Sequence, residues 1–311
     1  MKHIFIINPA AGKGKSLELI PYIKECFKDC EEDYIVRITE YPGHATELAK
    51  EYSGKGKCRI YSIGGDGTVN EIVNGMAGTD SALGIIPSGS GNDFFRSIHA
   101  GNDIKRILLD TVIGEERQVD LAKANDKYFI NVASVGFDAE IVFNAQKFKK
   151  LPGISGSMAY VLSLLYTTVI NKNNNIEIDI DGIRQKMSVL LAAIANGRYY
   201  GGGMMPAPDA KLNDGWLDIC LIRVTPRWKI FALFPKFIKG LHGQLKEVSF
   251  YRGKSVTIQS EKYISLSTDG EVVTAKTIKF EILERAINVI FPGGGNTAAM
   301  LELCEGKNIF R

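Results

Sequence analysis

Short apolar runs alternate with longer amphipathic stretches over the first third of the chain. The runs are five or six residues long and read as buried strands, while the stretches between them repeat their apolar residues at helical spacing. Strands are predicted at 3–7, 34–39, 59–63 and 82–86, and helices at 17–27, 45–52 and 68–76. This alternation is typical of a parallel, doubly wound, Rossmann-like α/β sheet that binds ligands at the carboxyl ends of its strands.

The pattern changes in the middle of the chain. Helices are predicted at 103–112, 139–150 and 157–170, and strands at 119–121 and 128–132. Short alternating segments then dominate, at 176–180, 188–195, 217–222, 255–259, 263–268, 277–283 and 286–290. Many short strands at such spacing favour a β-sandwich. We therefore expect an α/β domain over 1–122, to which 292–311 returns, and a β-rich domain over 123–291.

A glycine cluster follows the third predicted strand, in the order Gly64-Gly65-Asp66-Gly67-Thr68. Thr68 with Glu71 three residues later has the form of a capping box, which predicts a helix starting at Thr68. Backbone N–H groups at such a turn, beside a helix N-terminus, suit a phosphate. Asp66 would repel that phosphate unless a cation such as Mg²⁺ lay between them. The alternative is an ordinary turn with a solvated aspartate.

Three other strand ends carry candidate loops. Residues 8–16, NPAAGKGKS, end like a Walker A loop, but Pro9 occupies the position of its first glycine, so a looser phosphate-facing loop is favoured. Residues 86–94, IPSGSGNDF, form a second small-residue loop. At Thr39, after the second strand, a solvated hydroxyl and a ligand contact are equally compatible with the pattern. Two small-residue loops on one sheet edge predict a binding cleft.

Composition adds few constraints. A net charge of +3 gives no indication of nucleic-acid binding, although a basic face toward acidic phospholipid stays open. The five cysteines lack metal-ligand spacing and indicate reduced thiols. The apolar run at 158–170 is too short to span a bilayer, which takes about 20 residues, and the first residues lack signal-peptide form. We therefore expect a cytoplasmic protein.

Taken together, GGDGT, NPAAGKGKS and IPSGSGNDF make the chain resemble the diacylglycerol kinase catalytic family, which includes sphingosine and ceramide kinases and bacterial soluble lipid kinases. The likeness continues, in the family's order, through Val119-Asp120-Leu121, 131–136, Gly201-Gly202-Gly203-Met204, 214–218 and Asp269-Gly270-Glu271. It covers nearly the whole chain.

The resemblance implies a two-domain kinase that transfers the ATP γ-phosphoryl group to a lipid hydroxyl in an interdomain cleft. ATP would bind the N-terminal domain and the lipid the β-rich domain. The implied ATP contacts are Asn8, Pro9, Ala10, Ala11, Gly12, Thr39, Gly65, Asp66, Gly67, Thr68, Val69, Asn70, Glu71 and Ser90. The chain departs from the family at Gly89-Ser90, where Gly-Thr is usual; serine keeps the hydroxyl.

By the same likeness, Asp66 and Asp120 belong to the acidic network that holds the catalytic Mg²⁺. A second, structural Mg²⁺ would lie at Lys211, Asp214 and Trp216, where lysine and tryptophan can offer only backbone carbonyls. The alternative there is a simple turn at 213–215. Glu271 matches the family's general base, which would deprotonate the lipid hydroxyl; its alternative is a turn carboxylate.

The lipid would be reached at a membrane surface, which implies a cytoplasmic protein peripheral to the inner face of the membrane. Candidate docking faces are Lys147, Lys149 and Lys150 with Phe143 and Phe148, and Lys236 and Lys239 among Phe231, Phe234, Phe237 and Ile238. Each set is equally compatible with a core-facing helix that carries solvated lysines. Diacylglycerol is the default acceptor, and a homo-oligomer stays open. The competing interpretations are a NAD kinase, which shares the GGDGT loop, and a non-catalytic lipid-binding regulatory protein.

Overall fold

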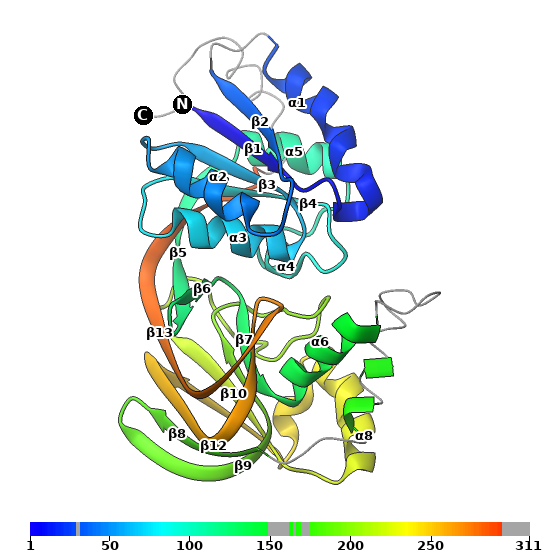
Figure 1. Cartoon of the computed structure of the whole chain (residues 1–311), viewed down its shortest axis with the longest axis vertical. Coiled ribbons are helices and arrows are strands. Elements are labelled where there is room, and N and C mark those ends of the chain that lie inside the picture. Colours follow the sequence, from blue (N-terminus) through cyan, green and yellow to red (C-terminus); the bar gives the residue numbers. More distant parts are fainter. Residues whose placement is uncertain (29–31, 149–161, 164–165, 169–173, 294–311) are drawn as a thin grey trace. The chain divides into compact units, whose positions relative to one another are not determined.

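The computed structural model describes residues 1–28, 32–148, 162–163, 166–168 and 174–293 (Figure 1). The chain divides into two compact units, which are described separately. Unit 1 comprises Met1–Leu121 and the segment that starts at Glu284, and unit 2 comprises Ala122–Leu283. Two strands, β5 (Glu115–Ala124) and β13 (Glu271–Phe291), run from one unit into the other.

Unit 1 is built on a parallel sheet. Its strands are β1 (His3–Ile7), β2 (Tyr34–Ile38), β3 (Arg59–Gly64) and β4 (Ala82–Pro87), in the order β4-β3-β1-β2, and the end of β13 pairs in parallel with β4. Every residue of β1 and β3 is buried, including the polar residues His3, Arg59 and Ser62. The predicted parallel pairing is present; the Rossmann-like, doubly wound arrangement stays a prediction.

Helices pack against this sheet. α1 (Ile20–Cys26) and α5 (Ile104–Val112) share a core with β1, β3 and β4 that includes Phe5, Tyr61 and Leu108. α2 (His44–Ser53) packs on α3 (Asp66–Met76), and both contact the sheet. The remaining helical segments in the described part of the unit are the 3₁₀ segment η1 (Ala11–Leu19) and α4 (Asp93–Ile98).

Two predictions about these helices were wrong. The helix expected at 17–27 is interrupted, because η1 continues to Leu19 before α1 begins. The capping box does not form: α3 begins at Asp66, and the Oε2 of Glu71 accepts a hydrogen bond from the Ala45 N–H in the first turn of α2, at 3.1 Å. Glu71 thus serves a neighbouring helix, and the hydroxyl oxygen of Thr68 instead accepts from Asn8 Nδ2.

Unit 2 is mainly antiparallel. Its further strands are β6 (Lys127–Phe129), β7 (Val132–Gly136), β8 (Asn174–Ile180), β9 (Ile183–Ala195), β10 (Leu217–Arg223), β11 (Val248–Gly253) and β12 (Ser255–Thr268). They follow the order β11-β10-β9-β7-β12-β13, and β8 pairs with both β9 and β12. The core beneath them includes Phe129, Ile178, Ile219, Ile258 and Phe280.

Strand boundaries in unit 2 differ from the prediction. The two strands expected at 255–259 and 263–268 form the single strand β12, whose register shifts between Gln259 and Ile264. The pair expected at 277–283 and 286–290 forms part of β13, in which Arg285 adopts a left-handed conformation. The strand expected at 128–132 is divided between β6 and β7.

The helical segments in the described part of unit 2 include α6 (Phe137–Phe148), α8 (Arg227–Ile238) and the 3₁₀ turn η2 (His242–Gln244) (Figure 1). The helix expected at 139–150 corresponds to α6. Most of the helix expected at 157–170 lies outside the described residues. Within the described part of the chain, no helix has the length and apolar content that a membrane crossing requires.

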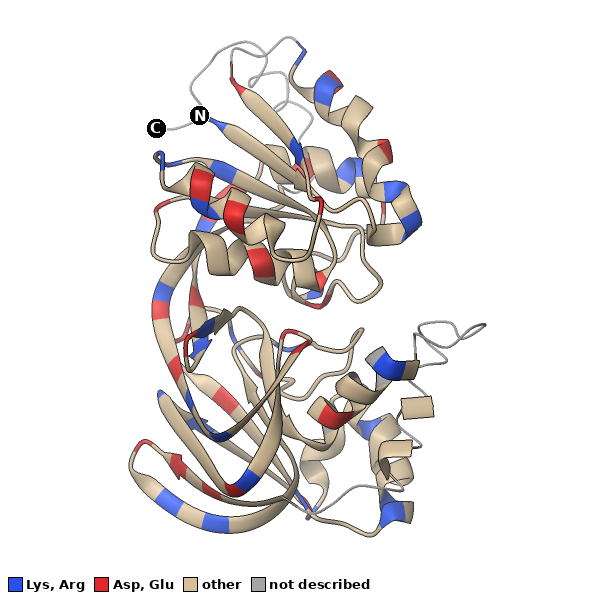
Figure 2. Ribbon diagram, viewed as in Figure 1, with Lys and Arg blue, Asp and Glu red and all other residues tan. Residues whose placement is uncertain are grey.

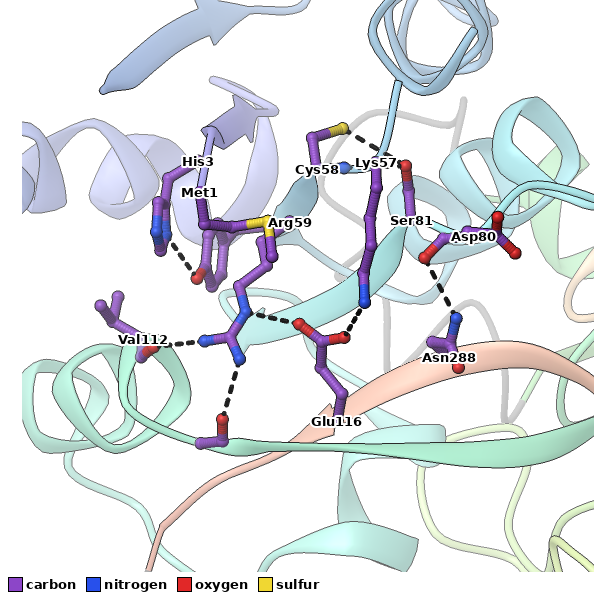
Figure 3. Close-up of polar contacts among 12 residues, drawn as sticks. Met1, His3, Lys57, Cys58, Arg59, Asp80, Ser81, Val112, Glu116 and Asn288 are labelled. Atoms are coloured by element: carbon purple, nitrogen blue, oxygen red, sulfur yellow. Dashed lines mark hydrogen bonds and ion pairs between the residues drawn. The ribbon is translucent and has the colours of Figure 1, made fainter. Parts of the chain in front are cut away.

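A buried polar cluster ties β1 and β3 to neighbouring segments (Figure 3). His3 Nδ1 lies 2.8 Å from the Tyr61 hydroxyl, and its Nε2 lies 2.7 Å from Glu32, which also binds the N-terminal ammonium group. Arg59 donates to Glu116 and to the carbonyl of Val112. Burial lowers the pKa of His3 from 6.5 to about 4, although Glu32 opposes this shift; the Arg59 charge and the terminal ammonium act in the same direction as burial.

We predict that acidification from pH 6.5 to 4 reduces the free energy of unfolding by up to about 3 kcal/mol through His3. In the unfolded chain His3 takes up a proton below pH 6.5, whereas in the folded chain it stays neutral down to about pH 4. Protonation therefore favours the unfolded state in this window. Urea denaturation at several pH values measures the effect, and His3→Gln, which cannot titrate, should flatten the profile. An unchanged profile in that variant would exclude His3 as its source.

Candidate functional site

Three loops follow the carboxyl ends of β1, β3 and β4, which are neighbours in the sheet. Backbone hydrogen bonds continue from the strands into the loops: the Asn8 N–H donates to the Ile63 carbonyl at 2.9 Å, and the Ser88 N–H donates to the Gly64 carbonyl at 2.8 Å. The structure therefore brings the NPAAG, GGDGT and PSGSG segments together on one edge of unit 1. This confluence is the candidate site.

Glycine is required where these loops touch. A Cβ on Gly89 would lie 2.4 Å from the Cα of Gly65. Because the clash would be with a backbone atom, no change of side-chain rotamer could remove it. Gly12 has a φ of +61°, and a Cβ there would lie 2.7 Å from the Ser88 carbonyl oxygen. The small residues thus allow three backbones to approach one another, which leaves the loop edge lined by main chain.

Asp66 links two of the loops. Its Oδ2 accepts a hydrogen bond from the Asn92 N–H at 2.8 Å, and its Oδ1 accepts one from the Asp93 N–H at 2.7 Å. These are the N–H groups at the beginning of α4, where a carboxylate also interacts favourably with the helix dipole. Asp66 is therefore held in place by the neighbouring loop, a contact that the sequence did not predict.

A second carboxylate, that of Asp93, lies beside Asp66. A Cβ on Gly91 would lie 2.4 Å from Asp66 Oδ2 and 3.3 Å from Asp93 Oδ2, so the two acids border the same glycine. Asp93 is buried and was missed by sequence reasoning, although it belongs to the quoted GND stretch. Two carboxylates of this kind fit a hard cation such as Mg²⁺. Among the described residues, however, no group of three or more His, Cys, Asp or Glu side chains could hold a metal.

The loop after β1 is closed by its own side chains. Asn8 donates from Nδ2 to the Thr68 hydroxyl at 3.1 Å and accepts from the Ala10 N–H at 3.0 Å. The Ser16 hydroxyl donates to the Asn8 carbonyl at 2.7 Å. Because this serine is buried and engaged by the loop itself, the segment does not follow Walker A chemistry, in which that hydroxyl binds Mg²⁺.

The other residues that the resemblance implies as ATP contacts differ in their exposure to solvent. Gly65, Gly67 and Ser90 are partly or fully exposed at the loop edge, as are Pro9, Ala10 and Ala11, whereas Val69 and Asn70 are buried inside α3. Thr39 follows β2 and is half-buried, with its N–H donating to the Ile7 carbonyl at 2.8 Å. Glu71 is engaged at the start of α2. The ATP contacts as a set stay a prediction.

Asp120 occupies a different position from Asp66 in unit 1. It is buried on β5, and its Oδ1 accepts a hydrogen bond from the Arg285 N–H at 2.8 Å. Arg285 has a φ of +50°, so this bond holds an uncommon backbone conformation in β13. The contact gives Asp120 a structural role that the sequence did not reveal, and its membership of a magnesium network stays a prediction.

Glu271 lies in unit 2, at the beginning of β13. The preceding turn uses left-handed conformations at Asp269 (φ +46°) and Gly270 (φ +95°), the geometry of a tight hairpin. The Asp269 carboxylate accepts from the Ile130 N–H at 2.9 Å and from the Val132 N–H at 3.1 Å. Asp269 therefore fastens the hairpin to the segment between β6 and β7, and Glu271 projects as an exposed carboxylate from an anchored turn.

The residues proposed for the structural Mg²⁺ lie near β10. Asp214 forms an ion pair with Arg252, and its Oδ1 accepts from the Trp216 N–H at 3.3 Å. Arg252 also binds Asp218 at 3.1 Å. Burial raises the pKa of Asp218, and the carboxylates of Asp214 and Asp209 add to that rise while Arg252 opposes it. Such an acidic cluster suits a cation, and the Arg252 guanidinium is the cation that binds it in this structure. Lys211 is exposed. The metal site stays a prediction.

An apolar pocket lies in unit 2 between α6, α8 and the sheet. Its walls are formed by aromatic and aliphatic side chains, with Tyr200 the only one of the described lining residues that carries a side-chain hydroxyl. The lining residues are Phe137, Ile141, Leu190, Leu191, Tyr200, Met204, Ile222, Ile230, Leu233, Phe234 and Phe237. The lining is apolar enough to suit a hydrocarbon chain, and most of its residues belong to one of the hydrophobic core clusters of unit 2.

Family models match both parts of the chain. The diacylglycerol kinase catalytic domain matches residues 2–124, and the YegS C-terminal NAD kinase beta sandwich-like domain matches residues 131–291. The two matches cover most of the chain and meet close to the division between its two units. The second description also agrees with the antiparallel strands of unit 2.

Named relatives match over almost their full length. The diacylglycerol kinase of Mycobacterium tuberculosis (strain ATCC 25618 / H37Rv) is 30% identical over 298 residues, covering 93% of this chain and 95% of the relative. That of Bacillus subtilis (strain 168) is 29% identical over 290 residues, covering 92% and 95%. A crystal structure of a putative diacylglycerol kinase from Bacillus anthracis str. Sterne matches with a TM-score of 0.75 at 28% identity, covering 96% and 98%. The chain therefore belongs to the diacylglycerol kinase catalytic family and carries its β-sandwich-like C-terminal domain.

Proposed function

We propose that the protein transfers the γ-phosphoryl group of ATP to a lipid hydroxyl, with diacylglycerol as the first candidate acceptor and phosphatidic acid as its product. The observation that carries the proposal is the meeting of three small-residue loops around Asp66 and Asp93 in unit 1. Main chain exposed beside a helix N-terminus suits a polyphosphate, and adjacent carboxylates suit the cation that accompanies it. The family name of the relatives supports the same reaction.

Each group has a distinct task in this proposal. The glycine loops position the phosphates, while Asn8 and Thr68, hydrogen-bonded to each other, brace the first loop against α3. Asp66 and Asp93 would hold Mg²⁺, which would neutralise phosphate charge when bound. Glu271 would accept the proton of the lipid hydroxyl as the new P–O bond forms and the bond from the γ-phosphorus to the β,γ-bridging oxygen breaks, which releases ADP. Asp269 keeps the turn of Glu271 in place. Unit 1 thus serves the nucleotide and unit 2 the acceptor.

The apolar pocket of unit 2 supports a lipid acceptor over a small polar one. Its lining is almost wholly hydrocarbon, which favours an alkyl chain. We place the reaction at the inner face of the cytoplasmic membrane, since diacylglycerol resides in bilayers. The substrate would therefore be taken from a membrane surface, with ATP supplied from the aqueous side.

A NAD kinase is the second candidate, because the matched C-terminal domain is described as NAD kinase-like. The test offers γ-labelled ATP and Mg²⁺ to the purified protein with equal concentrations of diacylglycerol in mixed micelles and of NAD. We expect the label in phosphatidic acid at a rate at least about 100-fold above that in NADP, since an apolar pocket favours the lipid. Label in NADP alone would replace the proposal. Lipid binding without transfer to either acceptor, by a folded protein, would favour a non-catalytic regulatory role.

A further inference from the structure

Helix α8 of unit 2 presents apolar side chains to solvent on the face opposite its core contacts. Ile230 and Phe237 are buried, and with Leu233 and Phe234 they line the apolar pocket. On the other face Trp228 is 68% exposed and Phe231 46%, with Ile238 exposed at the end of the helix. Leu241, shortly after the helix, is 62% exposed. The predicted docking set of Phe231, Phe234, Phe237 and Ile238 is thus divided between two faces.

This exposed face cannot be the core-facing side of the helix, because that side is already occupied. Trp228, Phe231, Pro235 and Ile238 recur at intervals of three or four residues, which places them in one stripe. Large aromatic residues exposed together in this way mark an interaction surface. We call Trp228, Phe231, Ile238 and Leu241 the α8 stripe.

The charged residues of α8 and of the segment that follows it, up to residue 246, are all basic. Arg227, Lys236 and Lys239 are exposed beside it, and the sequence from 227 to 246 contains no acidic residue (Figure 2). Glu247, the next acid along the chain, binds Lys229 at 2.8 Å. Aromatic and aliphatic side chains flanked by Lys and Arg are the composition of helices that lie in the interface of an anionic bilayer.

The other predicted docking face has fewer supporting observations. On α6, Phe143 is 44% exposed and the Lys147 ammonium lies 4.1 Å from its ring centroid. Phe148 is half-buried against the Tyr166 ring, and Lys149 and Lys150 lie outside the described residues. Lys147 and Phe143 therefore form a cation–π contact with each other. The α8 stripe has more large exposed apolar side chains than α6, and more exposed Lys and Arg residues beside it.

We propose that the α8 stripe docks unit 2 on an anionic phospholipid bilayer, with Trp228 and Phe231 inserted at the headgroup level and Lys236 and Lys239 bound to lipid phosphates. The inference rests on the proposed lipid kinase function for its purpose, but the binding itself is independent of catalysis. Since the opposite face of α8 lines the apolar pocket, docking would bring that pocket to the membrane from which an acyl chain is drawn.

Vesicle binding tests the proposal. Sedimentation with sucrose-loaded vesicles of phosphatidylcholine containing about 30 mol% phosphatidylglycerol compares the wild-type chain with Trp228→Ala/Phe231→Ala and with Lys236→Gln/Lys239→Gln. We expect each double variant to lower the partition coefficient by at least about tenfold. The matched control is Tyr263→Ala, which removes another exposed aromatic residue beside a lysine, Lys276, from β12 of the same unit. It should bind like the wild type.

Fluorescence locates the contact. The difference spectrum between the wild type and Trp228→Phe isolates the Trp228 signal, which should shift to the blue on adding anionic vesicles and be quenched by lipids brominated near the glycerol backbone. Equal binding by the wild type and both double variants would overturn the proposal. The absence of a blue shift in Trp228 fluorescence would also overturn it. So would light scattering that finds a dimer for the wild type and a monomer for Trp228→Ala/Phe231→Ala, since a second copy would then cover the stripe.

Activity on two forms of the acceptor separates this inference from the proposed function. Trp228→Ala/Phe231→Ala should phosphorylate a short-chain diacylglycerol, kept below its micellar concentration, at the wild-type rate. With diacylglycerol in anionic vesicles, the rate of this variant should fall at least about tenfold, in proportion to its loss of vesicle binding. Equal losses on both forms would overturn docking as the role of the stripe. If the wild type phosphorylates neither form yet binds vesicles through α8, docking stands and the kinase proposal fails.

Discussion

Replacing Glu271 by glutamine is expected to lower kcat by about 10²- to 10⁴-fold, the usual contribution of a positioned general base. Glutamine keeps the size and shape of glutamate but cannot accept the hydroxyl proton. Glu271 is exposed at the beginning of β13, so its substitution should leave the Tm and the ATP KM close to wild type. Initial rates with saturating ATP and diacylglycerol measure the loss.

The control for this variant is Glu281→Gln, which removes another exposed carboxylate from the same strand. It should retain wild-type turnover, because nothing places it at the reacting atoms. A rate for Glu271→Gln equal to that of Glu281→Gln would remove Glu271 from the mechanism. A fall in Tm together with kcat would instead indicate that the turn, and not the base, had been lost.

Gly89→Ala is expected to have the second largest effect, on binding and stability together. The new Cβ would lie 2.4 Å from the Gly65 Cα, and a backbone atom cannot move aside as a side chain can. The loops after β3 and β4 must therefore separate, at a cost of about 1–3 kcal/mol in the free energy of unfolding. We expect kcat/KM for ATP to fall by more than about 100-fold, because the phosphate-facing main chain is displaced.

Gly67→Ala, in the first turn of α3, serves as the stability control. A Cβ at Gly67 would meet no atom within 4 Å, so its free energy of unfolding should equal or slightly exceed that of the wild type. Urea denaturation compares the two variants, and isothermal titration with an ATP analogue measures affinity. A Gly89→Ala protein with wild-type stability and affinity would contradict the interpretation that the two loops form one site.

The strands and loops of the candidate site could be predicted because their signals are local. A buried strand such as β3 is a run of apolar residues, and the glycines that end it are adjacent in sequence. The order of such runs predicted the parallel pairing of unit 1. Periodicity also placed α5, where Asp103 accepts from the Lys105 and Arg106 N–H groups as an N-cap.

The errors arose where a residue's partner is distant along the chain. Glu71 resembled half of a capping box, but its carboxylate binds Ala45, because α2 packs beside α3. The role of Asp269 depends on N–H groups of 130 and 132, which no local pattern connects to the hairpin. The lengths of β12 and β13 were underestimated because each strand contains polar residues that resemble a turn in the sequence. In β12 they lie at a register shift, and in β13 one of them adopts a left-handed conformation.

The acid pair shows the same limitation at the candidate site itself. Asp66 was identified from its glycine-rich surroundings, whereas Asp93 was quoted only as part of the IPSGSGNDF loop and was given no role. Only the close approach of the two loops at Gly91 brings the carboxylates together. Sequence reasoning therefore identified the loops of the site, and the contacts between the loops required the structure.

Transfer of label from ATP to lipid is the direct test of the proposed lipid kinase activity. The purified protein is incubated with γ-labelled ATP, Mg²⁺ and a total bacterial lipid extract, with Glu271→Gln as the matched blank, and labelled products are separated and identified by mass. We expect one phosphorylated lipid class, phosphatidic acid, made by the wild type and nearly absent with Glu271→Gln. No labelled lipid from a folded protein that binds ATP, or the same product from both proteins at equal rates, would contradict it.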